Sequence, residues 1–236
     1  MLMTVKHKKK MLAQVLSGEK VLSPGEKVPS NKMPSTSLQN NNDKSVINYS
    51  LEQDLSALHD LVDVSKKIEL KKTALIPKWT PIVDEYIRSG AHHKFEPLVF
   101  LAVWMLDAEK LPEALAYADY AIAQQQPMPD RFKRDLSTFM AAGIHDWAQR
   151  QYKAGHSAEP YFSQIIDRIE NKQWIVTDSI VLGFIYKLAA MFAEEANDLE
   201  KAEQFYLKCV DANPEGHGVK TKFSSLLKKL GKALTL

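Results

Sequence analysis

The segment LPEALAYADYAIAQQQPMP, residues 111–129, decides the class of fold. Small and apolar residues recur in it at helical spacing, and prolines follow, which is typical of a helix that packs closely on a neighbour. A second segment, DLEKAEQFYLKCVDANP at 198–214, repeats the pattern at a constant offset. The offset pairs Ala114 with Ala202, Tyr117 with Phe205 and Ala121 with Cys209. We predict that each segment holds the second helix of a degenerate tetratricopeptide-like hairpin.

The rest of the chain also favours helices, because no alternating β-branched run exceeds about four residues. Short connections between the helices predict antiparallel hairpins. The fold class is therefore expected to be all-α, with a helical-hairpin body over 75–236. The expected helices of this body are 80–89, 94–108, 111–125, 130–153, 158–170, 177–195, 198–212 and 218–231.

A separate helix is predicted ahead of this body, over 47–74. Ser50 begins a capping box, and an apolar seam with coiled-coil-like spacing follows it. Pro77 and Pro81 are expected to separate this helix from the next. Such a short seam must pack on the body or on copies of itself, and we favour self-association. The oligomerisation residues would be Leu51, Leu55, Leu58 and Val62.

Residues 1–46 are expected to form a disordered basic arm, because they are rich in Ser, Pro, Gly and Asn and poor in apolar residues. The whole chain has a net charge of only +2, yet residues 1–45 hold eight lysines against three acids. A basic arm on a mildly acidic body indicates either contact with nucleic acid or a solubilising tail.

Three lysine clusters are candidates for binding phosphate, which lysine does without reading bases. One cluster lies on the C-terminal helix, at 220–232. The other two are taken as the candidate DNA-binding residues: Lys6, Lys8, Lys9 and Lys10 in the arm, and Lys66, Lys67, Lys71 and Lys72 at the end of the seam helix.

No convincing catalytic motif accompanies these clusters. The sequence has no Walker A spacing, no H-E-x-x-H and a single cysteine, so we expect no metal site, no cofactor and no intrinsic catalysis. A nuclease would need clustered carboxylates to hold Mg²⁺. The weak candidate is the D-x-x-E-x-K set Asp167, Glu170 and Lys172, which is more simply read as a solvated helix end.

The chain offers no apolar run of the roughly 18–20 residues that a membrane span needs. The basic start is followed by no long apolar stretch, so no secretory signal is expected. One cysteine excludes internal disulfides and suits a reducing compartment. We expect a cytosolic protein without a membrane partner.

Residues 75–129 resemble the GpM-type terminase small subunit of the peduoviruses. The resemblance is carried by the P-x-W-x-P turn around Trp79, the Trp104–Asp107 stretch, the Ala-Leu-x-x-Ala-x-Tyr-Ala helix and the closing Met-Pro. It extends more weakly to about residue 230. Such subunits recognise the packaging site on viral double-stranded DNA and recruit the large terminase subunit, which supplies the motor. They commonly assemble as homo-oligomeric rings, in the cytoplasm of the host cell.

The resemblance also implies the label of an endonuclease subunit. Two alternatives to DNA recognition therefore stay open: a Mg²⁺-dependent endonuclease subunit that cuts concatemeric DNA, and a helical-repeat adaptor that binds only protein.

Overall fold

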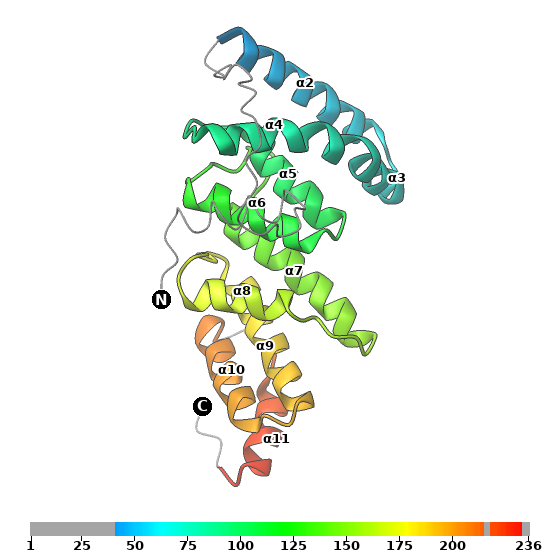
Figure 1. The fold of residues 1–236 in the computed structure, drawn as a ribbon. Coiled ribbons are helices and arrows are strands. Elements are labelled where there is room, and N and C mark those ends of the chain that lie inside the picture. The colour runs from blue at the N-terminus through cyan, green and yellow to red at the C-terminus, as the bar shows by residue number, and fades with distance from the viewer. Residues whose placement is uncertain (1–40, 215–217, 233–236) are drawn as a thin grey trace, which may run out of the picture. The chain divides into compact units, whose positions relative to one another are not determined.

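The computed structural model describes residues 41–214 and 218–232, and every regular element in those ranges is a helix (Figure 1). The all-α prediction is confirmed. The chain divides into two compact units, one ending at His93 and the other beginning at Lys94. Most of the predicted arm, including Lys6 and Lys8–Lys10, lies outside the described residues.

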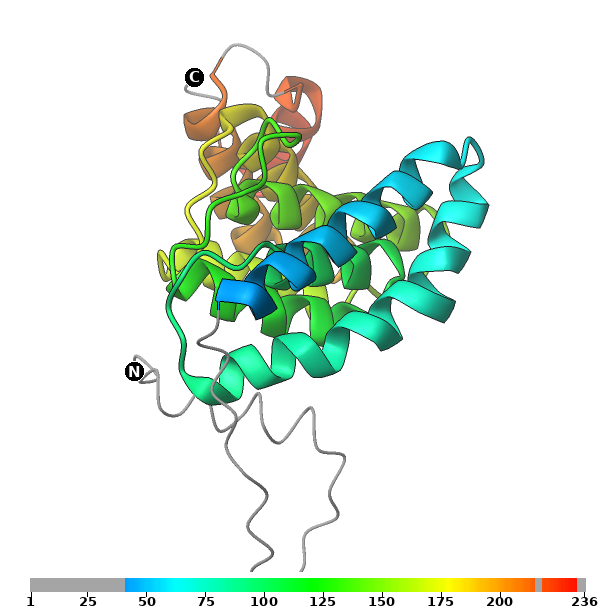
Figure 2. The same ribbon diagram turned by 90° about the horizontal axis from the view of Figure 1, so that it is seen from above.

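The first unit is a helical hairpin. It consists of α2 (Asn41–Asp60), α3 (Val64–Leu70), η1 (Lys71–Leu75) and α4 (Ile76–Ser89). The backbone keeps right-handed helical dihedral angles through Lys71 and Ile76, so α3, η1 and α4 form one uninterrupted helix. The chain reverses direction between α2 and α3, which lays α2 alongside the long helix (Figure 2).

The predicted boundaries of the seam helix were wrong at both ends. The helix begins at Asn41, ahead of the predicted start at residue 47. The half-buried Ile47 extends its inward-facing apolar stripe one turn ahead of Leu51. Residues 41–46 therefore belong to a helix and not to the arm. The helix ends at Asp60, because Asp63 caps a new one by accepting a hydrogen bond from the Ser65 amide at 2.7 Å.

Pro77 and Pro81 do not interrupt the helix, although the sequence predicted that they would. A proline ring presses on the carbonyl four residues before it, which for Pro77 is Thr73. Thr73 lies in the wider π-helical turn, where the Ile76 amide donates to the Lys71 carbonyl five residues back. Pro81 lies inside α4. Trp79, between the two prolines, is fully buried.

The second unit stacks successive helices, as predicted. Its helices are α5 (Glu96–Asp107), α6 (Leu111–Ala123), α7 (Leu136–Lys153), α8 (Tyr161–Glu170), α9 (Ser179–Glu195), α10 (Leu199–Ala212) and α11 (Lys220–Lys229). α5 packs on α6 and α7, α7 also packs on α8 and α9, and α10 packs on α9 and α11. The three equivalent positions of α6 and α10 are all buried. That these hairpins are degenerate tetratricopeptide-like repeats stays a prediction.

The core of this unit is built around α5, whose residues from Pro97 to Leu106 are all buried. A helix that is apolar on all sides must be covered on all sides. Gly143 of α7 permits close approach: a Cβ there would meet Leu106 Cδ2 at 2.5 Å.

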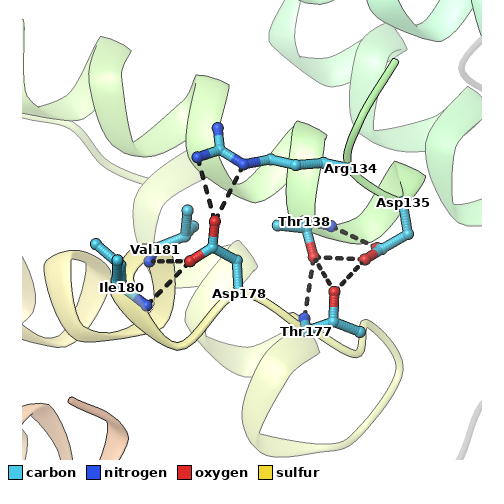
Figure 3. A network of polar contacts seen from close by, with 7 residues as sticks. All are labelled: Arg134, Asp135, Thr138, Thr177, Asp178, Ile180 and Val181. Atoms are coloured by element: carbon cyan, nitrogen blue, oxygen red, sulfur yellow. Dashed lines mark hydrogen bonds and ion pairs between the residues drawn. The ribbon is translucent and has the colours of Figure 1, made fainter. Parts of the chain in front are cut away.

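A polar network fastens the N-termini of α7 and α9 together (Figure 3). Asp135 caps α7 and accepts hydrogen bonds from the Thr138 and Thr177 hydroxyls at 2.7 and 2.5 Å. Asp178 caps α9 and pairs with Arg134 at 3.2 Å. Burial would raise the pKa of Asp135, but the threonine hydrogen bonds outweigh it and hold that pKa below its ordinary value. The network fixes where the α9–α10 hairpin begins.

Candidate nucleic-acid interface

The lysines predicted to end the seam helix lie on α3 and η1. Lys66 and Lys72 are exposed, while Lys67 and Lys71 are half-buried. All four fall within about two turns of one helix, because α3 and η1 are continuous. We call these four residues the α3–η1 lysine face.

Three lysines of this face, Lys66, Lys67 and Lys72, have no carboxylate partner among the described residues. Lys78, farther along the same long helix, differs, because its ammonium lies 2.6 Å from Asp54. An ammonium without a carboxylate partner can bind phosphate without first breaking an ion pair.

The residues predicted for oligomerisation do not share one surface. Leu51, Leu55 and Leu58 are buried within the single chain, with 3%, 8% and 8% of their surface exposed. Val62 lies in the break after α2 and is 95% exposed. The leucine stripe thus packs within its own chain, which was the alternative left open by the sequence.

Asp54 is a residue that sequence reasoning missed. It accepts hydrogen bonds from the Trp79 indole at 2.7 Å and from Lys78. These bonds join α2 to α4 and satisfy the polar atom of a fully buried tryptophan. Its position one turn from Leu51 and Leu58 gave only the weak signal of an acid beside an apolar stripe.

The nuclease candidates lie at the C-terminal end of α8 and just beyond it. Glu170, at the end of α8, accepts a hydrogen bond from Tyr186 at 2.8 Å and pairs with Lys208. Burial would raise the pKa of Glu170, but Lys208 and Tyr186 lower it below its ordinary value. Asp167 and Lys172 are both exposed, and Lys172 follows the helix in a left-handed conformation. In the described part of the chain, no three His, Cys, Asp or Glu side chains gather closely enough to hold a metal ion.

The described residues thus form an all-helical protein with four lysines gathered on α3 and η1. A family model described as the phage small terminase subunit matches residues 48–178, more than half of the chain. This chain therefore belongs to the phage small terminase subunit family, and the resemblance seen in the sequence is confirmed.

Two curated relatives carry corresponding descriptions. The chain is 30% identical over 172 residues to a protein of Haemophilus phage HP1 called "Probable terminase, endonuclease subunit", covering 70% of this chain and 61% of the relative. It is 22% identical over 160 residues to the "Terminase, endonuclease subunit" of Escherichia phage P2, covering 68% of this chain and 64% of that protein. The match thus spans less than two thirds of either relative. No solved structure matches the chain significantly.

Among the residues that the structure describes, no helix is both long and apolar enough to cross a membrane.

Proposed function

We propose that this protein is a DNA-packaging subunit that recognises viral double-stranded DNA at the packaging site. It would then recruit and regulate the large terminase subunit. The observation that carries the proposal is the family match over residues 48–178, a range that includes the α3–η1 lysine face. Its place of action would be the host cytoplasm, where viral DNA is packaged.

The physical basis of DNA binding is counterion release. Each lysine that neutralises a phosphate releases a condensed cation from the duplex, so affinity falls steeply as salt rises. Within the α3–η1 lysine face, Lys66, Lys67 and Lys72 can supply this term without first breaking an ion pair with a described carboxylate. Lysine contacts of this kind hold the duplex without distinguishing bases. The arm lysines at 6, 8, 9 and 10 would add to the same term.

The test compares binding to duplex DNA before and after the face is neutralised. Lys66→Gln, Lys67→Gln, Lys71→Gln and Lys72→Gln together remove four charges while preserving helix propensity. We expect the slope of log affinity against log salt to become shallower by roughly 3–4. Fluorescence anisotropy over a range of NaCl concentrations measures this slope. Absence of any binding by the wild-type protein at low salt would refute the proposal.

A matched control removes the same charge elsewhere. Lys110, Lys133, Lys153 and Lys201 are exposed, and they make no ion pair with a described residue. Replacing these four by Gln changes net charge equally, so it separates a local interface from a general electrostatic effect. We call this variant the scattered control.

The protein would act as a homo-oligomer, as a ring around or beside DNA, and would dock the motor through a surface of its helical hairpins. Co-purification with the large subunit of the same phage tests the docking.

Deletion of residues 1–45 tests the adaptor alternative. An adaptor that binds only protein would keep all its interactions and would show no DNA binding before or after the deletion.

The endonuclease alternative is supported by the names of the two relatives, both of which are called endonuclease subunits. In this chain, Glu170 is already engaged by Tyr186 and Lys208, which disfavours it as a Mg²⁺ ligand. We propose that DNA cutting resides in the large subunit. No cofactor is then needed by this chain, and Mg²⁺ would matter to it only under the nuclease alternative.

A further inference from the structure

The C-terminal helix α11 is held in a defined orientation by its apolar side. Phe223, Leu226 and Leu227 are buried, and α11 packs on α10. The ring of Phe223 lies 5.5 Å from that of Tyr206, measured between centroids. Because the three apolar residues occupy one side of the helix, the opposite side must face solvent.

Four lysines surround this buried stripe on the exposed part of α11. Lys220, Lys222, Lys228 and Lys229 are all exposed, and none forms an ion pair with a described residue. Lys232, just beyond the helix, behaves differently, because its ammonium lies 2.5 Å from Glu203. The helix KTKFSSLLKK contains no acid of its own. We call the four residues the α11 lysine face.

Helix stability does not explain this arrangement. Lys228 and Lys229 lie in the last turn, where cations complement the helix dipole. Lys220 and Lys222 lie in the first turn, where cations oppose it. Lys187 of α9 adds another cation near this end, since its ammonium donates to the Gly218 carbonyl at 3.2 Å. The helix dipole therefore does not explain why Lys220 and Lys222 lie in the first turn, so we look for a ligand that these cations would bind.

The composition of the face favours a polyanion over a protein partner. Protein interfaces concentrate binding energy in aromatic residues and arginine, and they are depleted in lysine. The exposed residues of α11 are lysines, Thr221 and Ser225, and no large apolar side chain of α11 is exposed. Ammonium and hydroxyl donors are the groups that contact phosphate oxygens.

We propose that the α11 lysine face is a second phosphate-binding surface for duplex DNA. This inference rests on the proposed function and extends it, because α11 belongs to the second unit whereas the α3–η1 lysine face belongs to the first. Contacts to the backbone alone make the α11 contribution independent of base sequence.

The test uses the full-length protein and a duplex of about 30 base pairs, once with the phage packaging-site sequence and once with a scrambled sequence. The α11 variant carries Lys220→Gln, Lys222→Gln, Lys228→Gln and Lys229→Gln. We expect affinity to fall roughly ten-fold or more for both sequences, and the salt slope to become shallower by about 3–4. The corresponding Lys→Arg variant keeps the charge and should retain binding.

The scattered control decides the interpretation. If its affinity and salt slope fall as far as those of the α11 variant, the effect is general electrostatics and the inference is overturned. If the α11 variant binds like the wild type while the α3–η1 variant is weakened, the inference fails and the proposed function stands. If the wild type binds no DNA, the proposed function fails as well.

A second measurement needs no variant. Lysine acetylation of the wild-type protein, quantified by mass spectrometry with and without DNA, should show protection of Lys220, Lys222, Lys228 and Lys229. Lys110 and Lys153 should remain equally reactive in both conditions. Unchanged reactivity at all four α11 lysines in the complex would overturn the inference even if the Gln variant does not fold.

Discussion

Asp119 shows how much a single carboxylate contributes to the second unit. It accepts two hydrogen bonds from the Arg168 guanidinium, both at 2.9 Å, and one from the Trp174 indole at 2.8 Å. Trp174 is buried, and the Arg168 and Asp119 side chains are only 16% and 21% exposed. The carboxylate thus joins α6 to α8 and to the segment that follows α8.

Replacing Asp119 by Ala should lower the free energy of unfolding by about 2–4 kcal/mol. The reason is that it leaves a buried indole N–H and a half-buried guanidinium without their acceptor. Urea denaturation followed by circular dichroism measures the loss. The matched control is Glu109→Gln, which breaks the exposed pair of Glu109 with Arg150 and should cost less than about 1 kcal/mol. Equal losses in the two variants would contradict this assignment.

His145 should make stability depend on pH. Its ring is buried against Phe184, with centroids 6.1 Å apart. Burial lowers the pKa of His145 below 6.5, although Asp146 opposes the shift. The unfolded chain therefore binds the proton more readily, and the free energy of unfolding should fall as pH drops below about 6.5. His145→Phe keeps the stacking and should flatten this dependence, as thermal melts at pH 5–8 would show. The control variant His92→Gln, which replaces an exposed histidine, should leave the pH dependence in place.

At the scale of elements, the second unit was predictable and the first was not. Each helix from α5 to α11 is rich in apolar residues and is bounded by Pro, Gly or an Asp cap, and all of these signals are local. The first unit depends on signals that compete: Pro77 and Pro81 predict a break, but the π-turn of η1 and burial of Trp79 override it. The Asp63 cap was the local clue to the true break, and it lay within a seam that looked continuous.

The revised first hairpin makes opposite predictions for two residues that the sequence placed together. Leu55→Ala should lower the free energy of unfolding by about 2–5 kcal/mol, because it empties a buried position. Val62→Ala should change it by less than about 0.5 kcal/mol, because Val62 is 95% exposed. Chemical denaturation of both variants gives the comparison. Similar losses would restore the continuous seam that was predicted from the sequence.

At the scale of the whole molecule, the leucine stripe bears on assembly. Its members Leu51, Leu55 and Leu58 are covered within one chain, so a ring would be built from other surfaces. We expect native mass spectrometry of Leu55→Ala, well below its melting temperature, to give the same oligomeric mass as the wild type. A shift to monomer in a folded variant would return the stripe to the subunit interface.

The candidate interface was only partly predictable at this scale. Lysine clusters are visible in any sequence, but which of them are paired depends on residues far away in the chain. Lys78 and Lys232 pair with Asp54 and Glu203, whereas Lys66, Lys67 and Lys72 and the four lysines of the α11 lysine face form no ion pair with a described carboxylate. The fold therefore shows which lysines form ion pairs, which the sequence alone does not reveal.

Pairing also bears on the division of labour in the packaging complex. Glu170 is held by Tyr186 and Lys208, so its carboxylate serves to join α8 to α9 and α10. Glu170→Gln should cost about 0.5–1 kcal/mol of stability, because the Lys208 pair is partly exposed. It should leave DNA cleavage by the assembled terminase unchanged. The measurement is Mg²⁺-dependent cleavage of packaging-site DNA, by the purified chain and by the complex with the large subunit. Cleavage by the chain alone that disappears in Glu170→Gln and in Asp167→Asn would place the nuclease at the end of α8 and reverse the proposed division.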